Sequence, residues 1–245
     1  MNSDIGLAID LAERAGTLLR ELRGSGATEL GARGDASADA FLLDQLARAR
    51  PADAVLSEES ADDPARLGAD RVWIIDPLDG TREYAQPHRT DWAVHVALWE
   101  RGREITAAAV AVPALDVVYS SGDSLRRSTA ASEPGSPRIA VSESRPPACA
   151  GSLVTDLGGT LVPMGSAGAK AAAVLRGDVD AFVHAGGQYE WDSAAPAGVA
   201  AHAGLHASRI DGSTLRYNRP DPYLPDVLIC RPELAGPIMA SIRRG

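Results

Sequence analysis

The sequence predicts an α/β protein with two sheets covered by helices. Three observations carry this prediction: an amphipathic helical pattern opens the chain, strand-like runs cluster in the first half, and strands alternate with helices in the second. With 245 residues, 45% of them hydrophobic, the chain is long enough to bury a substantial core. We expect an α+β half over residues 1–130 and an α/β half over residues 131–245.

Helices open the N-terminal half. Apolar residues from Ile5 to Leu22 recur at helical spacing between charged residues, which predicts an amphipathic helix over residues 4–23. The glycine-rich stretch RGSGATELGARGD is typical of a connector. It leads to a second predicted helix over roughly residues 37–49, which Pro51 terminates.

Apolar runs bounded by turn residues then predict strands. These runs are DAVLSEES, DRVWIIDP, DWAVHVALWE, ITAAAVAVP and LDVVYSS. The second run is expected to end abruptly at Asp76-Pro77, because a proline holds the residue before it in an extended conformation. Residues 121–137 are rich in Ser, Gly, Pro and Arg, and they are the best candidate for a loop between the halves.

The C-terminal half alternates between strands and helices. The expected strands are RIAVSES, VDAFVH and PDVLIC, and the expected helices are GAKAAAVLRG, WDSAAPAGVAAHAG and the C-terminal segment. Such alternation is typical of helices packed on the faces of a sheet.

Charge and composition exclude several classes of function. A net charge of -9, from 33 acidic against 24 basic side chains, argues against a nucleic-acid polymer as partner, because such binding needs clustered cations. No run is long enough to span a membrane, and acids interrupt the apolar N-terminus, so we expect neither an anchor nor a signal peptide. Cys149 and Cys230 match no metal-ligand spacing. They predict two reduced thiols in a cytoplasmic protein, with a disulfide as the alternative.

Acidic residues stand where predicted strands end. Asp76 closes an apolar strand and Asp79 follows it closely, so a tight turn can bring both carboxylates together. Glu58 and Glu59 stand at another strand end, and Asp192 opens a predicted helix. Hard oxygen ligands without histidine or cysteine companions favour Mg²⁺ or Mn²⁺ over zinc. Any one of these acids alone is better explained as a cap or a solvated turn residue, but the set predicts a metal site for phosphoryl chemistry.

In order and spacing, the motifs SEES, WIIDPLDGTREY and EWDSAAPAG resemble the inositol monophosphatase superfamily of Mg²⁺-dependent, lithium-sensitive phosphomonoesterases. The resemblance covers nearly the whole chain. It implies a sugar-phosphatase fold, which is a layered αβαβα sandwich. It also implies a small phosphorylated substrate and two or three Mg²⁺ ions per active site, with Mn²⁺ as a substitute.

The resemblance also implies roles for individual residues. The implied metal ligands are Glu58, Asp76, the backbone carbonyl of Leu78, Asp79 and Asp192. Asp35 and Thr81 match the pair that orients and activates the attacking water, a step in which Glu58 also takes part. Backbone amides of Gly80 and Thr81 would hold phosphate oxygens, and Glu59 would lie beside the ligands or at a third ion. The implied mechanism is in-line attack by a metal-activated water without a covalent enzyme intermediate.

Other residues resemble one branch of the superfamily, the 3′(2′),5′-bisphosphate nucleotidases of the CysQ type. These enzymes remove the 3′-phosphate of 3′-phosphoadenosine 5′-phosphate (PAP). Arg82 opens the triplet REY, which is similar to a basic-Glu-aromatic signature of that branch. GSAGAK, with Ser166 and the chain's only lysine, Lys170, is similar to a segment whose lysine meets the non-scissile phosphate. His184 matches a position where some members carry a phosphate-binding arginine.

Several alternatives stay open from the sequence. The composition is similar to that of actinobacterial members with relaxed specificity, so fructose 1,6-bisphosphate or inositol 1-phosphate could be the main substrate. A non-catalytic binding module is disfavoured, because every implied metal ligand is present. Ser142 and Arg145 could line the substrate cleft or cap a loop, and the chain could be a monomer or a homodimer. The other four histidines show no ligand spacing and are expected in core or surface roles. They are His88, His95, His202 and His206.

Overall fold

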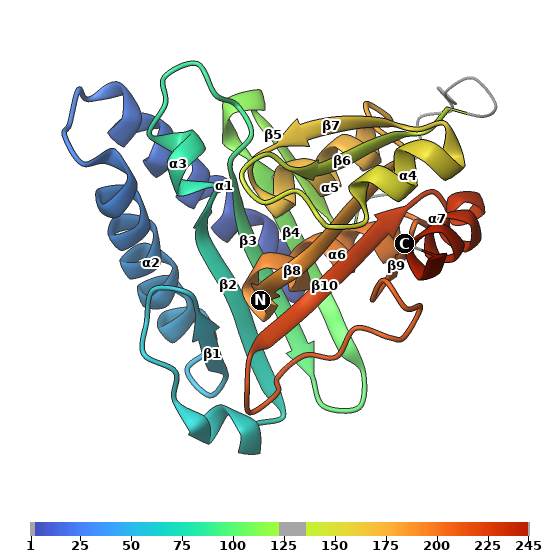
Figure 1. The fold of residues 1–245 in the computed structure, drawn as a ribbon. Helices are drawn as coiled ribbons and strands as arrows, with labels where there is room; N and C mark the ends of the chain where they lie inside the picture. Colours follow the sequence, from blue (N-terminus) through green and yellow to red (C-terminus); the bar gives the residue numbers. More distant parts are fainter. Residues whose placement is uncertain (1–2, 123–135, 245) are drawn as a thin grey trace.

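The computed structural model describes residues 3–122 and 136–244 as alternating layers of helices and sheets (Figure 1). The longer helices are α1 (Asp4–Gly24), α2 (Leu30–Ala49), α4 (Ala150–Leu157), α5 (Ala167–Arg176), α6 (Glu190–His202) and α7 (Pro232–Arg244). Helices α1 and α2 cover one face of the first sheet, and α5 and α6 lie between the two sheets. Helices α4 and α7 cover the outer face of the second sheet. The predicted αβαβα sandwich is therefore confirmed.

The first sheet has five strands in the order β1-β2-β3-β4-β5. They are β1 (Ala54–Ser57), β2 (Arg71–Asp79), β3 (Ala93–Glu100), β4 (Glu104–Val112) and β5 (Val117–Ser120). β1 and β2 are parallel, and the other neighbours are antiparallel. β2 does not end at Asp76 as expected but continues to Asp79, with a register shift between these two residues. The shift falls at Pro77, which has no N–H to donate to the neighbouring strand.

The second sheet also has five strands, in the order β7-β6-β8-β10-β9. They are β6 (Arg138–Ser142), β7 (Thr160–Met164), β8 (Ala181–Tyr189), β9 (His206–Ser208) and β10 (Tyr223–Cys230). β6 is parallel to β7 and β8, whereas β10 is antiparallel to β8 and β9. The predicted α/β alternation thus gives a mixed sheet.

Small side chains build the middle layer, because each of its helices faces a sheet on both sides. The buried stretch of α5 runs from Ala167 to Val174 and consists mostly of alanine. On α6, a Cβ added at Gly198 would lie 2.7 Å from Cγ2 of Ile105 on β4. Only glycine at that position allows so close an approach of α6 to the first sheet.

Helix α2 begins at Leu30, earlier than the expected start near residue 37. Two of the four glycines that suggested a connector, Gly31 and Gly34, lie inside the helix, where they allow close packing, whereas Gly24 ends α1 and Gly26 lies in the turn between the helices. A Cβ at Gly31 would lie 2.8 Å from Cγ2 of Thr81, and one at Gly34 would lie 2.8 Å from Cδ2 of Leu78. The helix therefore packs tightly against the DPLDGT segment, and this contact rather than a turn accounts for Gly31 and Gly34.

Two elements between residues 143 and 165 were not expected, namely α4 and β7. Pro163 argues against a strand in sequence terms, but β7 is an edge strand, where a missing N–H is tolerated. Four-residue helix α3 (Thr81–Tyr84) and the 3₁₀ turns η1 (Pro64–Gly68) and η2 (Pro113–Leu115) complete the described elements.

The expected boundary loop, residues 121–137, lies mostly outside the described residues, so the division at residue 130 stays a prediction. The core of the middle layer draws on both halves of the chain. It joins Ile74 and Val110 from the first sheet to Phe182 and Val227 from the second.

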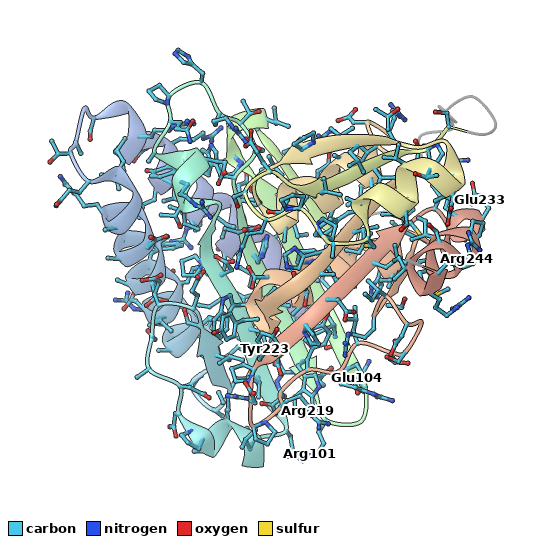
Figure 2. The ribbon with its side chains drawn as sticks, in the orientation of Figure 1. Arg101, Glu104, Arg219, Tyr223, Glu233 and Arg244 are labelled. Atoms are coloured by element: carbon cyan, nitrogen blue, oxygen red, sulfur yellow. The ribbon has the colours of Figure 1, made fainter. Side chains whose placement is uncertain are left out.

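Charged side chains lie around the periphery, as Arg101, Arg219 and Arg244 illustrate (Figure 2). Arg244 on α7 bonds Asp156 on α4 at 2.7 Å, which joins the two outer helices. Such exposed pairs contribute at most about 1 kcal/mol each, so the layers are held mainly by apolar burial. Among the helices of the described residues, none is both long and apolar enough to cross a membrane.

Both cysteines are free thiols. Cys149 is half-buried beside α4, and Cys230 is fully buried in β10. The structure thus has the two unpaired cysteines that the sequence predicts, and it does not join them in the alternative disulfide.

Candidate active site

A cavity of about 230 Å³ lies where the end of β2, the start of α5 and the start of α6 meet. It is lined by most of the site residues that the sequence predicts: Glu58, Asp76, Leu78, Asp79, Gly80, Thr81, Arg82, Ser166, Lys170, His184 and Asp192. These residues come from segments far apart in the sequence. The predicted Asp35 and Glu59 do not line the cavity and are described below.

The carboxylates converge because of the strand order. β1 and β2 run parallel, so their carboxyl ends meet at one edge of the first sheet. Glu58 follows the last residue of β1, and Asp76 and Asp79 stand at the end of β2. Asp192 reaches the same cavity from the first turn of α6, in the middle layer.

Asp79 accepts several hydrogen bonds on one oxygen. Its Oδ2 accepts from Oγ of Ser166 at 2.6 Å and from the backbone N–H of Gly168 at 2.8 Å. Nε2 of His95 lies 3.2 Å from the same oxygen. Burial would raise the pKa of Asp79, but these donors, His95 first, outweigh it and lower the pKa to about 2. Asp79 is thus ionised, and Oδ1 remains as the oxygen with which it can bind a cation.

His95 lies in the core, as expected, but it also contacts the site, which sequence spacing did not indicate. It stands on β3 opposite Asp76 and is fully buried. Asp76, Asp79 and His95 form a buried cluster that could hold a metal ion, with ligand atoms within 4.8 Å of one another. However, Nδ1 of His95 donates to the carbonyl of Trp191 at 3.0 Å, and Nε2 faces Asp79. We therefore assign His95 as a partner of Asp79 rather than a metal ligand.

The other carboxylates lie so close together, and so far from water, that their charged forms are disfavoured. Oδ2 of Asp76 is buried and has no hydrogen-bond partner in the described part of the chain. Burial and the charge of Glu58 raise the pKa of Asp76. Removal from water, followed by the charges of Asp192 and Asp79, raises the pKa of Glu58 to about 8. Burial and the charge of Asp79 raise the pKa of Asp192 to about 6. Crowded hard oxygens with an unpartnered buried atom fit a divalent cation.

Asp35 lies on α2 and contacts the site through Thr81. Its Oδ1 is 3.3 Å from Oγ1 of Thr81, which also lies 3.2 Å from the carbonyl of Leu78. Because a hydroxyl has one proton, Thr81 donates to one of these oxygens at a time. Burial and the charge of Glu59 raise the pKa of Asp35 to about 7. The expected pair is therefore in contact.

The turn GSAGAK is built around Asp79. Ser166 caps α5 by accepting from the backbone N–H of Ala169 at 3.0 Å, while its own hydroxyl donates to Asp79. Lys170 lines the cavity but is buried, with an exposed fraction of 4%. Its Nζ donates to the carbonyls of Gly165 and Ser166 and lies 5.1 Å from the centre of the Phe182 ring. Burial lowers the pKa of Lys170 to about 8.

The remaining predicted residues lie at the rim or behind it. Nη2 of Arg82 donates to Oγ of Ser144 at 3.3 Å. Nε2 of His184 donates to the carbonyl of Gly187 at 3.0 Å, and burial lowers the pKa of His184. A neutral ring that donates there has only an acceptor left for a ligand. Glu59 is exposed, and its backbone N–H approaches Oγ of Ser57 at 3.4 Å.

Further residues line the cavity beyond the predicted set. They are Glu83, Ser142, Ser144, Arg145, Gly165, Ala167, Phe182 and Gln188. Ser142 is the last residue of β6 and Arg145 follows it, so both stand at the strand end that made them candidates for the cleft. Phe182 and Gln188 lie inside β8 without any motif, so only the three-dimensional structure identifies them.

Family, sequence and structure comparisons find known proteins that are similar to this chain. The model of the inositol monophosphatase family matches residues 3–244. The chain is 58% identical over 218 residues to a protein of Mycobacterium tuberculosis named 3′-phosphoadenosine 5′-phosphate phosphatase, covering 87% of this chain and 82% of that protein. It is 53% identical over 254 residues to a protein of the same name from Mycobacterium leprae, and this match covers 98% of this chain and 94% of that protein. Inositol monophosphatase-II from Staphylococcus aureus shares the fold with a TM-score of 0.81 and 20% identity, covering 96% of this chain and 93% of that one.

Proposed function

Because this chain belongs to the inositol monophosphatase family, we propose that it is a metal-dependent phosphatase that removes the 3′-phosphate of PAP and releases AMP. The observation that carries the proposal is the identity of 53% over nearly the whole chain to a relative named for this substrate. The cleft supports it, since the carboxylates proposed to hold the metals and the cations proposed for a second phosphate line one cavity.

A substrate with two phosphates suits the mixed charge of this cavity. Its lining includes the carboxylates around Asp79 and also three basic side chains, those of Arg82, Arg145 and Lys170. In a chain with a net charge of -9, such a gathering of cations is notable, and it favours an anionic group away from the metals. A substrate with one phosphate, bound at the metals, would leave these cations without a phosphate to bind.

We propose Mg²⁺ as the metal, with two or three ions per site and Mn²⁺ as a substitute. The residues that would hold it are Glu58, Asp76, Asp79 and Asp192, with the carbonyl of Leu78. Their oxygen atoms fit a hard cation, and the unpartnered Oδ2 of Asp76 gives it a ligand. When bound, the ions would supply Lewis-acid stabilisation of phosphate charge and would lower the pKa of a bound water.

The chain's own residues would orient the reactants. Thr81 can accept a hydrogen bond from the attacking water while its own proton points to Asp35. Backbone amides of Gly80 and Thr81 would bind phosphate oxygens. Gly80 has a φ of 88°, and a Cβ there would lie 3.1 Å from the carbonyl of Asp91, so only glycine suits this position. Lys170 would meet the 5′-phosphate with the one N–H that its carbonyl partners leave available.

The assay that tests the proposal measures phosphate release from PAP, fructose 1,6-bisphosphate and inositol 1-phosphate, each with Mg²⁺ or EDTA. We expect Mg²⁺-dependent release with the highest kcat/KM for PAP. A higher kcat/KM for either of the other two substrates would refute the assignment to PAP. No phosphate release from any of the three substrates would refute the assignment as a phosphatase. Asp79→Asn should abolish release in all cases, with Asp44→Asn, an exposed helical residue, as control.

The place of action is part of the same proposal. Two free thiols are typical of a reducing compartment, so we propose that the protein acts in the cytoplasm. Whether it acts as a monomer or a homodimer stays a prediction, which size-exclusion chromatography with light scattering would decide.

A further inference from the structure

Asp39 is a buried carboxylate that no motif singled out. It lies on α2 with an exposed fraction of 8%, on a helix face that otherwise buries Ala38, Leu42 and Leu46. Its Oδ1 accepts from Oγ of Ser57 at 2.6 Å, and its Oδ2 accepts from Oγ of Ser60 at 2.8 Å. Both oxygens of one carboxylate are therefore committed to two serines.

These serines flank Glu58 and Glu59 in the SEES segment. Ser57 ends β1, and the residues after it form a bend without a helix or strand to hold them. Oγ of Ser57 also receives the backbone N–H of Glu59 at 3.4 Å. The bonds thus fix both ends of the bend.

Glu58 needs such a restraint. It lies at the cavity with Asp76, Asp79 and Asp192, in a bend that no helix or strand includes. A bend tied only by chain connectivity would leave the direction of the Glu58 side chain free.

We propose that Asp39 is a positioning residue that holds Glu58 at the metal cluster by clamping Ser57 and Ser60. The inference rests on the proposed function only for the assignment of Glu58 as a metal ligand. Hydrogen bonds to a charged group are about twice as strong as neutral ones, and a carboxylate can accept both hydroxyl protons at once. An amide at this position would keep one acceptor and offer the other serine a donor.

Helix α2 gives the clamp a second consequence. Asp35 stands one helical turn before Asp39, so both project from the same face. Asp35 contacts Thr81 at the end of β2, and Asp39 contacts the bend after β1. One rigid helix therefore sets the distance between the pair that orients water and the bend that carries Glu58.

The test measures Mn²⁺ binding by electron paramagnetic resonance in the full chain without substrate, beside thermal unfolding in EDTA. Asp39→Asn should weaken Mn²⁺ binding by about tenfold or more, the usual size of effect for residues that orient metal ligands. Asp44→Asn on the same helix should leave it within about twofold, because that exposed side chain contacts only its surface neighbours Arg48 and Gln45 among the described residues. Unchanged Mn²⁺ affinity in Asp39→Asn with a lowered unfolding temperature would overturn the proposal and leave a purely structural role.

Variants of the two serines test the same hydrogen bonds if Asp39→Asn does not fold. Ser57→Ala and Ser60→Ala each remove one bond and should each weaken Mn²⁺ binding. In a folded Asp39→Asn protein, Ser60→Ala should add little, because both act through one carboxylate. Fully additive losses, or no loss in either serine variant, would overturn the clamp. If the unaltered protein binds Mn²⁺ but releases no phosphate from PAP, the proposed function is refuted. The clamp would still stand, provided that the Asp39 and serine variants weaken Mn²⁺ binding.

Discussion

Nε2 of His95 lies 3.2 Å from Oδ2 of Asp79, and both side chains are buried. Burial alone would lower the pKa of His95, but the hydrogen bond and the charge of Asp79 outweigh it and raise the pKa. The imidazole also donates through Nδ1 to the carbonyl of Trp191, next to Asp192. One buried side chain thus connects the end of β2 with the first turn of α6, the two segments that carry the aspartates.

We therefore predict that His95→Leu destabilises the fold. Removing one partner of a buried charge pair costs about 3–5 kcal/mol. Asp79 would keep its bonds from Ser166 and Gly168 but would lose the positive charge that faces it. Urea unfolding in the presence of EDTA would measure this loss. His202→Leu is the matched control, since His202 only bonds a carbonyl of its own helix, that of Gly198 at 2.9 Å. A loss below about 1 kcal/mol in His95→Leu would contradict the ion pair.

Lys170 offers a direct measure of burial, because it is the only lysine in the chain. We predict that an amine-reactive reagent labels it slowly in the native protein and fully in urea. Its pKa of about 8 leaves much of the amine neutral at mildly alkaline pH, so slow labelling there would report burial rather than protonation. Mass spectrometry of the peptide with residue 170 would measure it. Equal rates in native and unfolded protein would mean that the amine is open to solvent.

Lys170→Met tests whether the lysine selects the substrate. Methionine keeps an apolar stem on Phe182 but removes the charge, so binding of PAP should weaken by about 1.5–3 kcal/mol, or roughly 10- to 150-fold in KM. Adenosine 3′-phosphate is the matched substrate, since it lacks only the 5′-phosphate. Its KM should change much less in the same variant. Equal changes for both would assign Lys170 to the architecture of the turn, where its carbonyl bonds already place it.

The sequence predicted the layers and the converging acids because both follow from local patterns. Strand ends and apolar periodicity located Asp76, Asp79 and Asp192, and the fold confirms that they share one cavity. His95 escaped notice because its partner is set by the register between β2 and β3, which includes a shift that spacing does not reveal. Asp39 was not predicted because no sequence motif marks a carboxylate that accepts from two serines on another element. The burial of Lys170 depends on carbonyls of a turn whose shape is fixed by Asp79.

At the start of α2, tight packing against the site outweighs the low helix propensity of glycine. Gly34 weakens the helix in sequence terms, yet a Cβ there would lie 2.8 Å from Cδ2 of Leu78 and 2.9 Å from Cε1 of Tyr84. Gly34→Ala should therefore destabilise the protein by about 1–3 kcal/mol through overpacking, and it should reduce kcat because Leu78 stands between Asp76 and Asp79. Gly151→Ala on α4 is the matched control, since its Cβ would meet nothing within 4 Å. That variant should gain up to about 1 kcal/mol from helix propensity and keep its kcat. Unfolding in urea and PAP turnover measure both variants, and a stabilised, fully active Gly34→Ala would refute the tight contact between α2 and the site.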